Sequence, residues 1–183
     1  MISHLNQINK SQSVNLIETG TNKGLTSIAI AQAIKDMGIN AKLDTFEINV
    51  DFYEQASKNI NESGLRSFVN LHLGDTKNTL NEYLKTHKKE INLKFCLLDA
   101  SHLCENFIFE FETIISYLDE TGIILVDNTA NVESMTKDKR VYEGLKILQK
   151  KYNKFNFVNL NTVSWWTPGL CIVQKKFQPQ EFN

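Results

Sequence analysis

Short apolar segments alternate with longer segments of helical periodicity along most of the chain. Two apolar runs, Phe95–Leu98 and Ile123–Val126, are nearly continuous, as is typical of strands buried on both faces of a parallel sheet. The pattern predicts strands at 14–18, 41–47, 67–73, 93–98 and 122–127, and helices at about 24–37, 51–63, 76–88 and 104–118. Gly38, Gly64 and Gly122 each follow a predicted helix, where glycine commonly forms a left-handed cap. The alternation predicts an α/β fold that binds ligands at the carboxyl ends of its strands.

The last part of the chain departs from this alternation. After a helix at about 137–152, strand-like segments at 155–160 and 170–175 are separated by a short loop. Strands joined in this way pair antiparallel. We therefore expect a doubly wound, mostly parallel seven-stranded sheet closed by an antiparallel C-terminal hairpin, within a single domain over residues 1–183.

Composition and charge narrow the function classes. The 183 residues are 42% hydrophobic, and the net charge of −1 gives no bulk attraction to nucleic acid or to an anionic membrane. We find no signal-peptide pattern and no apolar segment of the roughly 18 residues that a membrane span requires. Three cysteines without metal-type spacing favour a reducing compartment. We expect a cytoplasmic protein that binds neither nucleic acid nor membrane.

A glycine-containing turn follows the first predicted strand. The strand ends at Glu18, whose carboxylate would face a ligand, and the turn begins at Gly20. Gly20 tolerates backbone torsions that a side chain would resist, and Gly24 would let a ligand approach the helix start closely. Asn22 stands where the dinucleotide fingerprint Gly-x-Gly-x-x-Gly has its middle glycine. The turn therefore differs from that of nicotinamide-dependent enzymes.

Acidic and amide residues recur where the later strands end. Glu47 ends the second strand, and a carboxylate there can accept both hydroxyls of a ribose. Asp75 follows the third strand, where it could face a ligand or cap the next helix. Asp99 ends the fourth strand and Asp127-Asn128 ends the fifth, and these strands are expected to be neighbours. Carboxylate and amide oxygens suit magnesium or calcium, although each residue alone would also suit a loop cap.

These motifs resemble class I S-adenosylmethionine-dependent methyltransferases over about residues 12–176, in particular bacterial small-molecule and sugar-tailoring enzymes and the catechol O-methyltransferase family. The resemblance implies that S-adenosylmethionine binds to these residues: Glu18, Gly20, Thr21, Gly24, Glu47, Asp75 and Asp99. It also implies that Asp99, Asp127 and Asn128 hold Mg²⁺ or another divalent cation. The implied acceptor is the hydroxyl group of a small molecule.

The same resemblance suggests the catalytic residues. His102 lies where catechol O-methyltransferase carries its general-base lysine, so we expect His102 and Asp99 to be catalytic. An imidazole can take a hydroxyl proton at neutral pH, although His102 could instead bind a metal or be structural.

Trp165 and Trp166 are candidates for an apolar substrate wall or a contact in a homo-oligomer. A Rossmann-type oxidoreductase and a non-catalytic domain of the same fold are the alternative interpretations.

Overall fold

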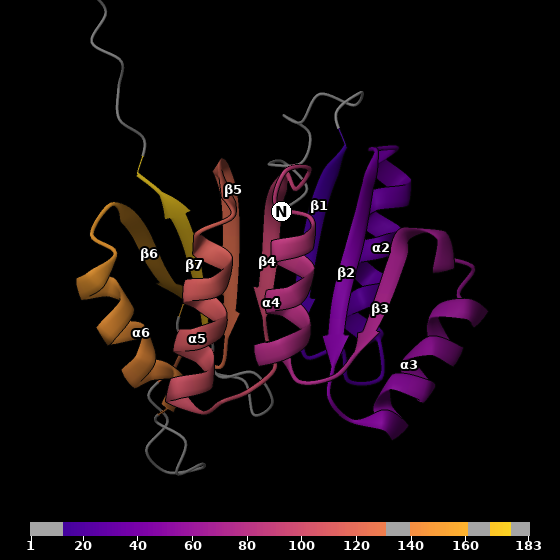
Figure 1. Ribbon diagram of the computed structural model, residues 1–183, viewed down its shortest axis with the longest axis horizontal. Coiled ribbons are helices and arrows are strands. Elements are labelled where there is room, and N and C mark those ends of the chain that lie inside the picture. The colour runs from indigo at the N-terminus through magenta and orange to yellow at the C-terminus, as the bar shows by residue number, and fades with distance from the viewer. Residues whose placement is uncertain (1–12, 131–139, 161–168, 177–183) are drawn as a thin grey trace, which may run out of the picture.

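A seven-stranded sheet forms the centre of the computed structural model, which describes residues 13–130, 140–160 and 169–176. The strands are β1 (Val14–Thr19), β2 (Ala41–Glu47), β3 (Val69–Leu73), β4 (Leu93–Leu98), β5 (Leu118–Asp127), β6 (Phe155–Leu160) and β7 (Leu170–Lys175). Their order is β3-β2-β1-β4-β5-β7-β6 (Figure 1). The first five pair in parallel, and β7 lies antiparallel between β5 and β6. The predicted fold class is confirmed.

Helices cover both faces of the sheet. They are α2 (Leu25–Met37), α3 (Val50–Glu62), the short 3₁₀ helix η1 (Arg66–Phe68), α4 (Thr76–Thr86), α5 (Cys104–Ile115) and α6 (Arg140–Lys151). One hydrophobic cluster joins α2 and α3 to the sheet, and a second joins α4, α5 and α6 to it (Figure 1). Burying each large aliphatic side chain of these clusters contributes about 1.5–3 kcal/mol. No helix in the described ranges is long and apolar enough to cross a membrane.

The start of β5 differs from the prediction. The strand begins at Leu118, four residues before the predicted start at 122, and α5 ends at Ile115. The added residues include Asp119, whose carboxylate lies 2.6 Å from Lys94 Nζ on β4. In the sequence pattern, a polar residue at this position indicates a loop. Its partner Lys94 on the neighbouring strand stabilises Asp119 within the sheet.

Gly122 corrects one sequence prediction. It lies inside β5 and does not cap a helix, whereas Gly38 and Gly64 have the expected left-handed conformation, with φ of 58° and 70°. A Cβ added at Gly122 would lie 2.6 Å from Leu118 Cδ1 and 2.9 Å from the Leu93 carbonyl oxygen. Close packing between β4 and β5 therefore explains this glycine.

The parallel strands bring their carboxyl ends to one edge of the sheet, the lower edge in Figure 1. Leu98 of β4 is paired with Val126 of β5, so Asp99 and Asp127 follow at adjacent positions. Glu18 of β1 lies between Thr45 of β2 and Leu97 of β4. This edge holds the candidate site.

Candidate active site

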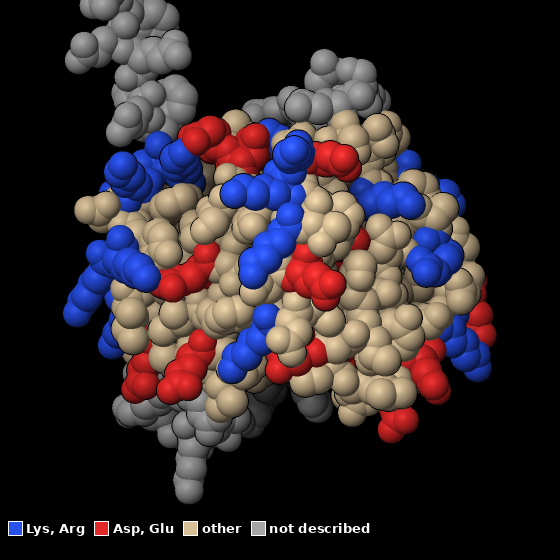
Figure 2. Space-filling view, in the orientation of Figure 1, with Lys and Arg blue, Asp and Glu red and all other residues tan. Residues whose placement is uncertain are grey.

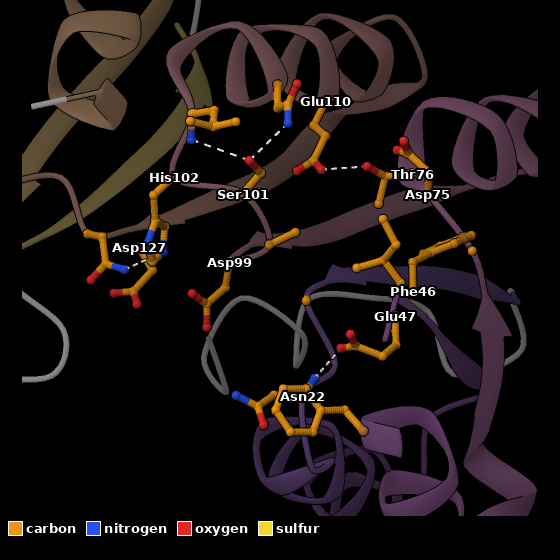
Figure 3. A pocket seen from close by; sticks show the side chains of 18 residues that line it. Asn22, Phe46, Glu47, Asp75, Thr76, Asp99, Ser101, His102, Glu110 and Asp127 are labelled. Atoms are coloured by element: carbon orange, nitrogen blue, oxygen red, sulfur yellow. Dashed lines mark hydrogen bonds between the residues drawn. The ribbon is translucent and has the colours of Figure 1, made fainter. Parts of the chain in front are cut away.

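A pocket of about 740 Å³ opens at the carboxyl edge of the sheet, among the turns that follow the five parallel strands (Figure 3). Among the predicted site residues, it is lined by Gly20, Glu47, Asp75, Asp99, His102, Asp127 and Asn128. Glu18, Thr21 and Gly24 are outside its lining. Trp165 and Trp166 fall outside the residues that the structure describes. Acidic groups predicted from separate strands thus share one cavity.

The turn after β1 depends on glycine for two reasons. Gly20 has a φ of 82°, and an added Cβ would lie 2.1 Å from the carbonyl oxygen of Asp99. The turn therefore fits tightly against the end of β4, in a conformation that a side chain would strain. Gly24 also has a φ of 82°, and its nearest neighbours are Ala56 and Ile60 of α3. Packing against α3 is its observed role.

Glu18 supports this turn from inside the protein. It is fully buried, and Ser27 Oγ and Thr45 Oγ1 both donate to its Oε2, Thr45 at 2.7 Å. The hydroxyls of Thr45 and Thr21 are 2.6 Å apart, which extends the network to the turn. Burial raises the pKa of Glu18 to about 7, against the opposing effect of the two hydroxyls. Its Oε1 has no hydrogen-bond partner among the described residues.

Glu47 is held by the backbone on both sides of its carboxylate. Its Oε2 accepts from the Asn22 N–H at 2.7 Å, and its Oε1 accepts from the Asn49 N–H at 2.8 Å. The side chain is 7% exposed and lines the pocket. Each carboxylate oxygen keeps lone-pair capacity for another donor. Glu47 is therefore a preorganised acceptor for a pair of ligand hydroxyls.

Asp75 has the capping role that the sequence left as an alternative. It is the N-cap of α4, and its carboxylate accepts from the Lys77 N–H at 2.9 Å. The residue is exposed at the rim of the pocket. Its part in binding S-adenosylmethionine stays a prediction.

Asp99 and Asp127 form a pair of neighbouring carboxyl groups, and the pKa of each is raised. Burial, the neighbouring Asp127 charge, a hydrogen bond to Asp127 and the charge of Glu18 together raise the pKa of Asp99 to about 7, and burial has the largest effect. Burial also raises the pKa of Asp127, although the Asn128 N–H and His102 act in the opposite direction. Two carboxylates this close favour either a shared proton or a bound cation.

His102 and Asn128 complete this end of the pocket. Asn128 has a φ of 57°, and its Nδ2 lies 2.5 Å from His102 Nε2. With the amide donating, that nitrogen of the imidazole carries a lone pair, as a proton acceptor requires. Asn128 Oδ1 is buried and has no hydrogen-bond partner among the described residues. A buried carbonyl oxygen of this kind is costly unless a ligand satisfies it.

The oxygen-rich end could hold a hard cation. Within the described ranges, no group of three or more His, Cys, Asp or Glu side chains is arranged to bind a metal. The predicted set contains two carboxylates, from Asp99 and Asp127, and the amide oxygen of Asn128. Such a set suits a cation that keeps several waters in its coordination shell, as Mg²⁺ does.

Sequence reasoning missed Glu110, which also lines the pocket. It lies on α5 and accepts from Thr19 Oγ1 at 3.0 Å and from Thr76 Oγ1 at 2.6 Å. The buried face of α5 consists of Phe107, Glu110, Phe111 and Ile114. An acid on the apolar stripe of a helix was the available signal, because buried carboxylates require specific partners.

Comparisons with known proteins agree with this architecture. A family described as "Methyltransferase domain" matches residues 17–129. No curated protein matches the chain. The O-methyltransferase TomG from Streptomyces achromogenes, solved with S-adenosylmethionine, is 19% identical with a TM-score of 0.72, over 96% of this chain and 77% of that one.

Two further solved structures share the fold. An O-methyltransferase from Bacillus cereus, solved with S-adenosylhomocysteine, is 21% identical with a TM-score of 0.70, over 88% of this chain and 74% of that one. An rRNA methylase from Streptococcus thermophilus is 12% identical with a TM-score of 0.67, over 95% of this chain and 93% of that one. The chain belongs to the methyltransferase-domain family and has the class I methyltransferase fold.

Proposed function

We propose that the protein transfers the methyl group of S-adenosylmethionine to a hydroxyl oxygen of a small-molecule acceptor. The observation that carries this proposal is a single pocket with two chemically different ends. One end has the fixed carboxylate of Glu47, and the other has Asp99, Asp127 and His102. The first end suits the ribose of a cofactor, and the second suits the deprotonation of an acceptor.

The cofactor would span the ends of the first three strands. Its ribose hydroxyls would donate to Glu47, and its methionine part would lie over the Gly20 turn. Glu18 and Thr21 would act from beneath, by holding that turn through Thr45. The two O-methyltransferase structures described above contain S-adenosylmethionine or S-adenosylhomocysteine, which supports this choice of cofactor.

Mg²⁺ or another divalent cation would be held by Asp99, Asp127 and Asn128. Two observations support the fit: the unpartnered Oδ1 of Asn128 and the mutual repulsion of the two carboxyl groups. A bound divalent cation lowers the pKa of a hydroxyl that coordinates it. The chain's own residues would then orient the acceptor at the end of the pocket opposite Glu47.

Methyl transfer is an in-line displacement that depends on alignment and on removal of one proton. The acceptor oxygen forms a bond to the methyl carbon as the carbon–sulfur bond breaks, which gives a methyl ether and S-adenosylhomocysteine. The hydroxyl proton would go to His102 Nε2, whose lone pair faces the Asn128 amide. The acceptor hydroxyl would replace that amide as the donor.

An RNA acceptor is the second candidate, because the chain spans nearly the whole length of an rRNA methylase. Net charge favours the small molecule, since RNA binding relies on clusters of basic residues. On the face covered by α4, α5 and α6, acidic and basic side chains are interspersed (Figure 2).

A cytoplasmic location and a homo-oligomer belong to the same proposal. The free state of all three cysteines supports the cytoplasmic location.

Titration calorimetry tests the cofactor directly. We expect S-adenosylhomocysteine to bind and NAD⁺ not to bind, with the same S-adenosylhomocysteine affinity in excess chelator. Absence of binding at millimolar S-adenosylhomocysteine would contradict the proposed function. Turnover that requires RNA, with an affinity that falls steeply with salt, would favour the second candidate.

A further inference from the structure

One buried carboxylate in the pocket has no part in the proposed methyl transfer. Glu110 is 2% exposed, yet it lines the same cavity as Glu47 and Asp99. It comes from the core-facing side of α5, where the other residues are apolar. Burying an ionisable group there costs free energy unless hydrogen bonds compensate it. The position therefore requires an explanation beyond packing.

Two hydroxyl groups fix the Glu110 carboxylate without saturating it. Thr19, at the end of β1, donates to Oε2, and Thr76, in the first turn of α4, donates to Oε1. Each oxygen has two lone pairs, so each can accept one more hydrogen bond. Within the described ranges, Glu110 forms no ion pair. Burial raises the pKa of Glu110, while the two hydroxyls lower it.

Glu110 occupies its own corner of the pocket. Figure 3 shows Glu110 beside Thr76 at one end, Glu47 at a second, and Asp99 with Asp127 at a third. With the cofactor ribose on Glu47 and its sulfonium toward Asp99, the base extends from the ribose toward the remaining corner. In that orientation, Glu110 would meet the edge of the purine.

We propose that Glu110 accepts a hydrogen bond from the exocyclic amine of adenine and thereby selects adenine over a 6-oxopurine. This inference rests on the proposed function. Adenine presents an N–H donor at position 6, whereas hypoxanthine presents a carbonyl oxygen that the carboxylate repels. Asp75, the other acid nearby, is exposed and its carboxylate caps α4. Buried and fixed from two sides, Glu110 is the acid that discriminates.

Calorimetry with S-adenosylhomocysteine and S-inosylhomocysteine tests this assignment. The wild-type protein should prefer the adenine ligand by about 10- to 100-fold, the equivalent of one hydrogen bond to a charged group. Glu110→Gln places an amide donor in the same space, so the preference should fall to within about threefold or reverse. Thr76→Val removes a hydroxyl that holds Glu110 but keeps the carboxylate, so the preference should remain even where the melting temperature falls.

Three results would overturn the inference: no preference in the wild-type protein, an unchanged preference in Glu110→Gln, or a preference erased by Asp75→Asn instead. Where Glu110→Gln does not fold, Glu110→Asp withdraws the carboxylate by one methylene and should narrow the preference at least fivefold. An unchanged preference in Glu110→Asp would then reject the assignment. A wild-type protein that binds no S-adenosylhomocysteine contradicts the proposed function itself, which separates the two failures.

Discussion

The two ends of the pocket use acidic side chains in opposite ways. At the β2 end, the carboxylate of Glu47 accepts one backbone N–H on each oxygen, so the protein itself stabilises its charge. At the β4–β5 end, Asp99 and Asp127 face each other and burial raises the pKa of both. The nearby Oδ1 of Asn128 has no partner among the described residues. The protein thus supplies hydrogen-bond partners for the acidic group at the β2 end, whereas the β4–β5 end keeps an oxygen without a partner among the described residues.

This difference indicates how each end would work. A preorganised acceptor such as Glu47 loses little free energy in binding a ligand, because its orientation is already fixed. The β4–β5 end gains its missing interactions only when a cation or an acceptor enters. Recognition of the cofactor should therefore be separable from chemistry at the acceptor, and substitutions at the two ends should have different signatures.

The largest expected effect is on turnover, and it arises at the β4–β5 end. Excess chelator or Asp127→Ala should abolish methyl transfer, because the chelator removes the cation and the substitution removes one of its proposed ligands. Calorimetry should show S-adenosylhomocysteine affinity within about threefold of wild type, since Glu47 is unaffected, and Asp127→Ala should also lose Mg²⁺ binding. The matched control is Asp51→Asn, an exposed acid on α3. Full turnover in excess chelator would rule out the cation and leave His102 and Asp99 as a metal-free pair.

The next effect separates proton transfer from metal binding at the same end. His102→Ala should lower turnover by about 10²- to 10⁴-fold, the usual contribution of a positioned general base. Mg²⁺ affinity should be retained, because His102 contacts the Asn128 amide nitrogen and not its oxygen. His87→Ala removes an exposed histidine at the end of α4 and should leave turnover unchanged. Equal loss of turnover and Mg²⁺ affinity in His102→Ala would make His102 a metal ligand.

The sequence predicted the fold more completely than the site. Strand and helix periodicity is local, so it located nearly every element, and Gly122 was misassigned because its role depends on contact with Leu93 across the sheet. The convergence of Asp99 and Asp127 followed from neighbouring parallel strands. A position at a strand end does not reveal which way a side chain faces. The sequence therefore did not predict that Glu18 is buried beneath the turn. Glu110 lay hidden within a helix whose apolar pattern drew attention to packing.

A smaller effect is expected at the β2 end. Glu47→Ala should weaken S-adenosylhomocysteine binding by about 1.5–3 kcal/mol, the cost of losing charge-assisted hydrogen bonds. Mg²⁺ affinity should be unchanged, because the β4–β5 end is separate from Glu47 in the pocket. Calorimetry of both ligands on one preparation measures the contrast. A Glu47→Ala protein with normal S-adenosylhomocysteine affinity would show that the ribose binds elsewhere.

The last effect is on the free energy of unfolding, and it arises beneath the Gly20 turn. Burial raises the pKa of Glu18 to about 7, above the value of 4.5 that is ordinary for the group. Between these values the folded protein binds more protons than the unfolded chain, so stability should fall as pH rises from about 5 to about 8. The contribution of Glu18 to this fall is about 2.5 kcal/mol.

Glu18→Gln removes the ionisation while it keeps acceptor capacity for the hydroxyls of Ser27 and Thr45. Its unfolding free energy, measured by urea titration at several pH values, should therefore decline less steeply over this window than that of wild type. Asp99 titrates in the same range and continues to contribute a slope in both proteins. Asp51→Asn, on the exposed surface of α3, should follow the wild-type curve. A Glu18→Gln curve as steep as that of wild type would mean that burial does not raise the pKa of Glu18. The hydrogen bonds from Ser27 and Thr45 would then stabilise its charge, as the backbone N–H groups stabilise that of Glu47.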